Sequence, residues 1–282
     1  MKKVIINADD FGICQGINEG IIYAHQRGIV TSTTLMANMP GFEQAVSLAK
    51  QNKDLGIGLH LNIVRGRPVS PANKVKSLIN DENKFFSDVF LILKRLVLGL
   101  INLEEVELEF RAQIEKILEK GIKISHFDSE KHVHSFPSIF KIIIRLAKEY
   151  NIQKIRFINE FCFSPFLFQT AKSLLISLAC SSMIRKIIEN DIFITDKFYG
   201  VCETGHMTSL RLKRTLYKVK DGITEIMVHP GFVIPEIIDL EKEIGSYHIN
   251  KFREQELQAL VDEGAKEVIK ERKIHLINFN NI

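Results

Sequence analysis

The densest group of side chains that could bind a metal or transfer a proton lies between His126 and His134. This segment reads HFDSEKHVH, so three histidines and two acids occupy nine positions. Mixed nitrogen and carboxylate ligands suit a divalent ion such as zinc, manganese or cobalt, and carboxylates also accept magnesium. A merely polar surface loop is the alternative. The position of the segment directly after a predicted strand favours a functional site.

Three further motifs end predicted strands with side chains of the same kinds. NADDFG places Asp9 beside Asp10, and adjacent carboxylates repel each other unless a cation, hydrogen bonds or solvent compensates. The pair therefore indicates one metal ligand beside one base. GLHLN sets His60 in an apolar strand, and HPG places His229 where an imidazole could protonate a leaving amine. The structural alternatives are a helix cap, a hydrogen-bonded core histidine and a plain turn, respectively.

Candidates for substrate contacts are weaker. Arg156 and Glu160 lie in and just after the run 154–158, and His132 and His134 are assigned to the substrate side of the histidine cluster. Arginine and aromatic groups bind hydroxyl-rich or acetylated ligands through hydrogen bonds and stacking. The aromatic segment 198–206 is a candidate for the same reason. A structural ion pair to a nearby acid explains Arg156 equally well.

Seven short β-branched runs must position these residues, and amphipathic stretches lie between them. The runs cover residues 4–7, 31–36, 57–63, 122–127, 154–158, 223–228 and 274–279. Helical spacing of apolar residues predicts helices over 16–27, 103–120, 138–150, 209–218 and 250–270. Alternation of this kind predicts βα units around a parallel sheet. Because the polar motifs follow strands, we expect a distorted, TIM-like (β/α) barrel with its site at the carboxyl rim, in preference to an open doubly wound sheet. Residues 65–84 are expected to form a loop over that rim.

Composition places the chain among folded proteins with one α/β domain, residues 1–282. Hydrophobic residues make up 45% and charged residues 26%, which leaves little room for disorder. The net charge of +4 comes from basic residues interspersed with acids, so nucleic acid is not an expected partner. The four cysteines form no C-x-x-C pair and the apolar start stops at two aspartates. We therefore expect reduced cysteines, no signal peptide and a cytoplasmic protein.

Two stretches, residues 85–101 and 161–184, are unusually apolar. Charged residues interrupt both, so neither is an uninterrupted membrane span. One interpretation is contact with an anionic membrane surface, which would suit a lipid-linked substrate. The other is packing, in the core or in a homodimer interface. Apolar stripes at helical spacing favour packing.

Together these motifs resemble those of the YdjC-like carbohydrate deacetylases, the family that includes chitooligosaccharide deacetylase. The resemblance rests on NADDFG followed by GIVTSTTLMAN, GLHLN, HFDS…HVH with Pro137, HPG and YHINKFREQEL, in the family's order and spacing. It covers most of the chain. It implies a distorted (β/α) barrel and a hydrolase that removes the N-acetyl group from an amino sugar or oligosaccharide, releasing acetate. It also implies a divalent ion, magnesium or zinc, on the rim.

Carried over residue by residue, the resemblance implies Asp9 as general base, His229 as general acid, and Asp10 and His60 as metal ligands. The family usually has a metal-binding histidine directly after the Asp-Ser of its cluster, and this sequence has Glu130 there. A glutamate can also bind a divalent ion, so Glu130 is the expected third ligand. Its harder oxygen and added negative charge should shift metal preference and weaken the Lewis acidity of the ion. The alternatives are a sugar-binding or regulatory module with a decayed metal site, and a metal-dependent amidase or phosphodiesterase that acts on a substrate without sugar.

Overall fold

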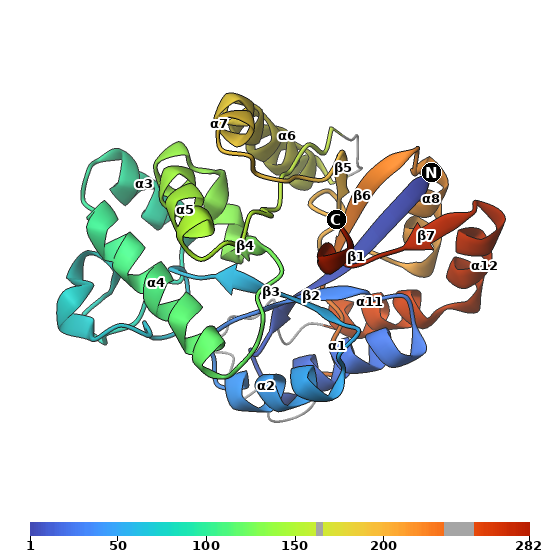
Figure 1. Cartoon of the computed structure of the whole chain (residues 1–282), viewed down its shortest axis with the longest axis horizontal. Coiled ribbons are helices and arrows are strands. Elements are labelled where there is room, and N and C mark those ends of the chain that lie inside the picture. The colour runs from blue at the N-terminus through green and yellow to red at the C-terminus, as the bar shows by residue number, and fades with distance from the viewer. Residues whose placement is uncertain (162–165, 234–250) are drawn as a thin grey trace.

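A parallel sheet forms the centre of the molecule and helices surround it (Figure 1). The computed structural model describes residues 1–161, 166–233 and 251–282. Within these residues the strands are β1 Lys2–Phe11, β2 Ser32–Leu35, β3 Gly56–Leu61, β4 Phe127–Ser129, β5 Lys197–Tyr199, β6 Gly222–Val228 and β7 Ile274–Leu276. Their order is β4-β3-β2-β1-β6-β5, and β7 pairs with the start of β1.

The sheet is curled, and isolated bridges extend it beyond β4 toward the segment that precedes β5. Phe127 of β4 pairs with Ile155, and Lys154 pairs with Phe193, which lies just before β5. Two backbone hydrogen bonds support the second bridge, because Ile155 N–H donates to the Phe193 carbonyl and Phe193 N–H donates to the Gln153 carbonyl. The expected single-domain, distorted (β/α) barrel is confirmed.

Two of the expected strands differ from the structure. The run 122–127 becomes a strand only at its last residue, and the run 154–158 makes isolated bridges instead of a strand. Backbone pairing in these two runs involves single residues, and a regular β-ladder needs several consecutive pairs. The structure adds the short strand β5, whose three residues are too few to show a periodic pattern. The other five expected runs coincide with β1, β2, β3, β6 and β7 to within a few residues.

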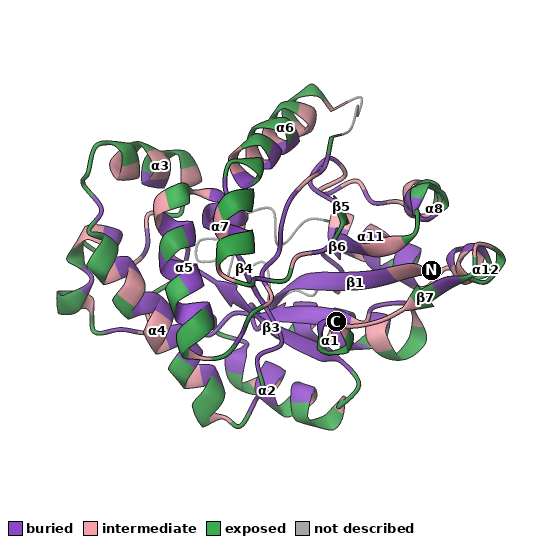
Figure 2. Cartoon of the chain, turned by 45° about the horizontal axis from the view of Figure 1, so that its top comes forward, coloured by how far each residue is buried: buried purple, intermediate pink, exposed green. Residues whose placement is uncertain are grey.

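Helices cover the outer side of the sheet, and their inward faces are buried (Figure 2). The α-helices are α1 Gln15–Arg27, α2 Phe42–Gln51, α3 Val89–Val97, α4 Leu103–Glu119, α5 Pro137–Glu149, α6 Leu167–Ser181, α7 Ile184–Glu189, α8 Ser209–Lys218, α11 Phe252–Val261 and α12 Glu263–Glu271. The 3-10 helices are η1 Ala72–Lys74, η2 Lys76–Leu78, η3 Glu130–Ser135 and η5 Phe279–Asn281. The helix expected over 250–270 is divided because Asp262 takes an extended conformation and caps α12, accepting from Ala265 N–H at 3.0 Å.

Parallel pairing places the polar motifs at one edge of the sheet. Register aligns His60 of β3 with Asp128 of β4, and Ala8 of β1 with Val228 of β6. Asp9 and His229 each follow directly after the last aligned pair of their strands. The carboxyl ends of parallel strands meet at the same edge, so residues far apart in the sequence become neighbours there.

The cysteines depart in part from expectation. Cys14 and Cys180 are buried free thiols, but Cys202 is disulfide-bonded, so the expectation of reduced cysteines does not hold for that residue. Cys162 lies outside the described residues. Among the helices described, none combines the length and apolar character needed to cross a bilayer.

Close packing at Gly58 generates a test of the fold. A Cβ at this position of β3 would overlap the buried ring of His126, which stacks on Phe279 with 3.6 Å between centroids. Gly58→Ala should therefore lower the free energy of unfolding by about 1–3 kcal/mol, measured by urea denaturation. The same substitution in a His126→Ala background should cost less, because the obstacle has gone. Equal costs in both backgrounds would contradict this account of the packing.

Candidate active site

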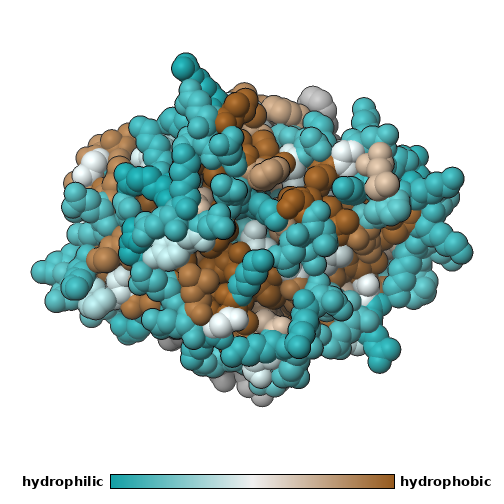
Figure 3. All heavy atoms as spheres, viewed as in Figure 1, coloured by the Kyte–Doolittle hydropathy of each residue, from teal (hydrophilic) through white to brown (hydrophobic). Residues whose placement is uncertain are grey.

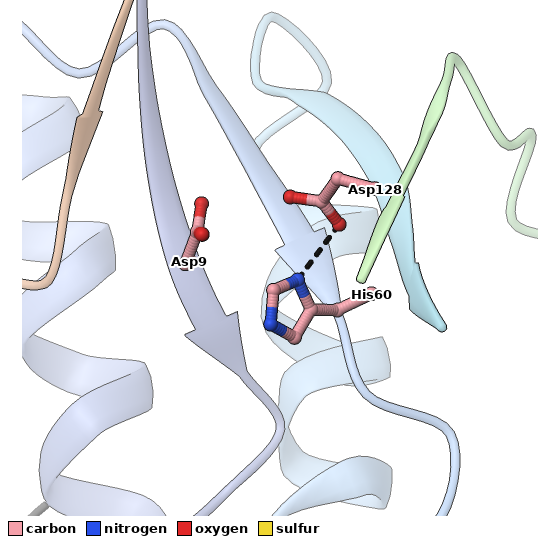
Figure 4. A group of neighbouring side chains, drawn as sticks. All are labelled: Asp9, His60 and Asp128. Carbon is pink, nitrogen blue, oxygen red and sulfur yellow. Dashed lines mark hydrogen bonds and ion pairs between the residues drawn. The ribbon is translucent and has the colours of Figure 1, made fainter. Parts of the chain in front are cut away.

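His60 is the centre of the site, and its ring is held from behind by Asp128. His60 Nδ1 donates to Asp128 Oδ1 at 2.7 Å (Figure 4). The hydroxyl of Thr34 on β2 donates to Asp128 Oδ2 at 3.1 Å. All three side chains are buried. A carboxylate on one ring nitrogen leaves the other nitrogen to face outward as a ligand. The contact therefore aims Nε2 of His60 into the pocket.

Asp10 and Glu130 turn one oxygen each toward that nitrogen. Glu130 Oε2 lies 3.3 Å and Asp10 Oδ1 lies 3.9 Å from His60 Nε2. Their other oxygens contact arginines: Arg65 Nε donates to Glu130 Oε1 at 2.9 Å, and Arg253 pairs with Asp10 Oδ2. One ligand atom from each of Asp10, His60 and Glu130 lies within 4.8 Å of the other two. The structure brings together the three residues expected to bind the metal.

A second group of possible ligands, Asp9, His60 and Asp128, meets the same distance criterion but suits an ion less well. Both oxygens of Asp9 accept hydrogen bonds from Arg156. Asp128 uses one oxygen for His60 and the other for Thr34 and Arg156. The oxygens of Asp9 and Asp128 thus face Arg156, Thr34 and Nδ1 of His60, whereas Asp10 Oδ1 and Glu130 Oε2 both face Nε2 of His60.

Charges within the pocket act strongly on each other because the charged side chains are buried. Burial alone would lower the pKa of His60, but Asp128 and Glu130 outweigh it and hold that pKa well above its usual value. Burial would raise the pKa of Glu130, but Arg65 and His60 keep it well below its usual range. A protonated His60 thus carries positive charge between two carboxylates. A divalent ion fits the same position, since it would supply positive charge to the same oxygens.

Asp9 owes its place in the pocket to an irregularity in β1. Neighbouring side chains of a regular strand point to opposite faces, yet Asp9 and Asp10 both line the pocket. The register with β2 shifts between Ala8 and Phe11, and Asp10 has a left-handed backbone with φ of 76°. This bulge turns both carboxylates the same way. The doubled acid of the sequence therefore acts as a pair.

Arg156 connects the acids beneath the pocket. Its Nη2 and Nη1 donate to Asp9 Oδ1 and Oδ2 at 2.7 and 2.6 Å, Nη1 lies 2.7 Å from Asp128 Oδ2, and Nε donates to Glu225 Oε1 at 2.7 Å. The guanidinium is fully buried. Of the two interpretations of Arg156, the structure shows the ion pair.

His229 directly follows β6, the strand that pairs with β1 on the side away from β2. Its partner is Glu256 of α11. The backbone N–H of His229 donates to Glu256 Oε2 at 2.6 Å, and its ring Nδ1 lies 3.8 Å from the same oxygen. Glu256 is itself buried and accepts from the Gly205 N–H at 3.2 Å. The Glu256 carboxylate therefore bonds two backbone N–H groups, those of His229 and Gly205, and so fixes both residues beside α11.

The turn after β4 completes the pocket. Lys131 and His132 take left-handed conformations with φ of 51° and 58°, which is uncommon for residues other than glycine and produces a sharp turn. Burial lowers the pKa of His132 well below its usual value, so its imidazole is neutral. Lys172 of α6 lies beside this turn, and burial lowers its pKa to about 8. These three side chains border the space left above His60.

The pocket contains most of the expected site residues, but three of them lie elsewhere. It is lined by Asp9, Asp10, His60, Ser129, Glu130, Lys131, His132, Lys172, Thr204, Met227 and His229. Outside this lining, Glu160 accepts from the Gly200 and Cys202 N–H groups, both at 3.0 Å, and His134 Nδ1 bonds the Ser129 hydroxyl at 2.6 Å. Arg156 lies beneath Asp9. A direct substrate contact by any of these three has no support in the geometry.

Several residues of the site were not expected from the sequence. Arg253 and Glu256 lie three positions apart on one face of α11 and contact Asp10 and His229 respectively. The only signal for them was that their helix carries the last motif of the family resemblance. Lys172 gave no signal, because a single lysine in an apolar stretch is expected to reach solvent.

The fold and the site define a (β/α)-barrel protein with a buried group of acids and histidines at its carboxyl rim. The chain belongs to the YdjC-like family, whose profile, described as YdjC-like protein, matches residues 3–271. Carbohydrate deacetylases of Brevibacillus brevis and Clostridium beijerinckii are 34% and 36% identical to it, over 99% of this chain and 99% and 100% of theirs. A solved structure from Enterococcus faecalis V583, provisionally described as a cellobiose-phosphate cleavage protein, is 30% identical with a TM-score of 0.78 and covers 99% of this chain and 98% of its own.

Glu225 generates a pH-dependent prediction. Burial, only partly offset by Arg156, raises its pKa to about 7, and its Oε2 has no hydrogen-bond partner among the described residues. A carboxyl whose pKa is raised on folding stabilises the fold below its unfolded pKa, and this contribution is lost as the pH rises through about 7. Glu225→Gln should therefore gain about 2–3 kcal/mol relative to the parent protein between pH 4.5 and pH 8. Denaturant unfolding at both pH values measures this difference, and an unchanged difference would exclude the titration.

Proposed function

We propose that this protein is a metal-dependent hydrolase that removes the N-acetyl group from an amino sugar, releasing acetate. The observation that carries the proposal is the convergence of His60 Nε2, Asp10 Oδ1 and Glu130 Oε2 in a pocket that Asp9 and His229 also line. Relatives that match the chain over its full length are carbohydrate deacetylases. Their activity supports the substrate class proposed here.

Asp10, His60 and Glu130 would hold the ion, which when bound supplies Lewis acidity to the acetyl carbonyl and to the attacking water. Asp9 accepts the proton of that water. Its two oxygens are fixed by Arg156, so the carboxylate is oriented before the substrate arrives. An oriented base at a buried position needs little reorganisation during the reaction.

His229 protonates the departing amine in this proposal. The Glu256 carboxylate accepts from the His229 backbone N–H at 2.6 Å and lies 3.8 Å from ring Nδ1, where it would stabilise the protonated imidazole that gives the proton. His132 and Lys172 border the same pocket, and in this proposal they bond sugar hydroxyls. The products are acetate and a free amino sugar.

Metal binding is the first test. Titration calorimetry of the metal-free protein with zinc, manganese and magnesium should show one site, and Glu130→Gln should weaken it by about tenfold or more, because a ligand oxygen loses its charge. Glu130→His should move the preference toward zinc. The exposed Glu267→Gln variant is the matched control and should bind like the parent. Identical affinities for all variants would remove Glu130 from the site.

Acetate release from a panel of N-acetylated sugars, with and without added ions, tests the reaction. Asp9→Asn and His229→Ala should each lower kcat by about 10²–10⁴-fold, as expected for loss of a general base or acid. Matched controls are Asp54→Asn and His275→Ala, both at exposed positions. Near-normal turnover by both site variants would refute these roles. Metal binding without acetate from any sugar would instead favour a binding module or an amidase on another substrate.

A further inference from the structure

Helix α6 is turned so that its large apolar side chains face outward. Its buried residues are Ser173, Ser177 and Cys180, which are small and repeat at helical spacing. Leu175 and Leu178 are 67% and 55% exposed on the other side. A helix on a soluble barrel normally does the reverse. Cys180 and Met183 of this stretch do pack in the core, but the outward leucines do not, and packing in a homodimer interface stays a prediction.

Helix α7 continues the same surface. Ile188 is 71% exposed and Ile184 is partly exposed, so α6 and α7 together present an apolar surface that we call the α6–α7 face. Apolar side chains gather at the upper edge of the molecule where these helices lie (Figure 3). The exposed large apolar residues of α6 and α7 are Leu167, Phe168, Leu174, Leu175, Leu178, Ile184 and Ile188. Contiguous exposed patches of this kind mark interaction sites.

Basic residues outnumber acids around the face. Helix α7 carries Arg185 and Lys186; Glu189 pairs with Arg185 at 2.7 Å, and Asp191 follows the helix. The single charged residue of α6, Lys172, faces the pocket instead. Helix α3, on the same upper edge in Figure 1, adds Lys94 and Arg95 next to exposed Phe90 and Val97, and its only neighbouring acid is its N-cap. Apolar residues flanked by lysine and arginine match an anionic lipid surface.

The face adjoins the active-site pocket. Lys172 lines the pocket from the inner side of α6, and α6 packs against the η3 turn that carries Glu130 and His132. A surface bound to the outer side of α6 would thus lie one helix away from the candidate ligands. A sugar head group that projects from that surface could reach the pocket while its lipid stays outside.

We propose that the α6–α7 face docks onto an anionic lipid bilayer, and that the site acts on an N-acetyl sugar carried by a membrane lipid. The second part rests on the deacetylase function proposed above. A second copy of the chain fits the face less well. A two-fold interface brings the same patch of each copy together, and the basic residues of α7 would then meet their own kind.

Vesicle co-sedimentation tests the docking independently of catalysis. The full-length protein should sediment with vesicles of phosphatidylcholine and phosphatidylglycerol at low salt, and much less with phosphatidylcholine alone or at high salt. Arg185→Glu should weaken binding by about fivefold or more, and Leu175→Glu should weaken it further. Leu210→Glu and Arg214→Glu on α8 are matched controls at exposed positions and should bind like the parent. Failure of the parent protein to bind anionic vesicles would overturn the proposal.

Turnover then tests the substrate. Leu175→Glu should release acetate from a soluble N-acetyl sugar as fast as the parent protein, but more slowly from an N-acetyl glycolipid in anionic vesicles. If Leu175→Glu lowered the rate of acetate release equally on both substrates, or on neither, the proposal of a membrane-bound substrate would be overturned. A dimer in light scattering that Leu175→Glu dissociates, without vesicle binding, would assign the face to a second copy. Absence of acetate from every sugar would refute the deacetylase function, while the vesicle result still decides the docking.

Discussion

The buried guanidinium of Arg156 is the contact on which the rim depends. Three carboxylates, those of Asp9, Asp128 and Glu225, come from three different strands and converge on it. Without the cation, like charges would lie within a few ångströms of each other in a medium that screens them poorly. One guanidinium does not neutralise three carboxylates, and the raised pKa of Glu225 shows which of them yields. The other two carboxylates, those of Asp9 and Asp128, lie at the pocket, where Asp9 lines it and Asp128 holds His60.

Arg156 also fixes the candidate metal ligand His60 indirectly, through Asp128. Asp128 is fixed by Arg156 and Thr34, so it can fix His60, whose free nitrogen then faces Asp10 and Glu130. Asp9 is oriented by the same guanidinium. The candidate base and the candidate ligand histidine are thus held by one buried residue, which links the stability of the barrel to the geometry of its site.

The sequence predicted the barrel because its strands are short β-branched runs with polar motifs at their ends. The same reasoning placed the polar motifs at one rim, and the family resemblance then selected Asp10, His60 and Glu130 among them. It could not place Arg253 or Glu256, because a buried charge on a helix looks like a solvated one until its partner is known. The orientation of α6 was equally hidden. Its buried serines, Ser173 and Ser177, donate to the Glu160 carbonyl, and Cys180 contacts Ser135 of η3, partners that the helix sequence does not reveal.

The negative charge of Glu130 is balanced by a neighbouring arginine. A glutamate in place of the histidine usual in the family should add negative charge and make a bound ion a weaker Lewis acid. Arg65 binds the distal oxygen of this carboxylate and keeps its pKa well below the usual range. The pair of Glu130 and Arg65 therefore carries no net charge, as a neutral imidazole would. Such compensation argues against a decayed site, because the negative charge that Glu130 adds has a buried arginine partner.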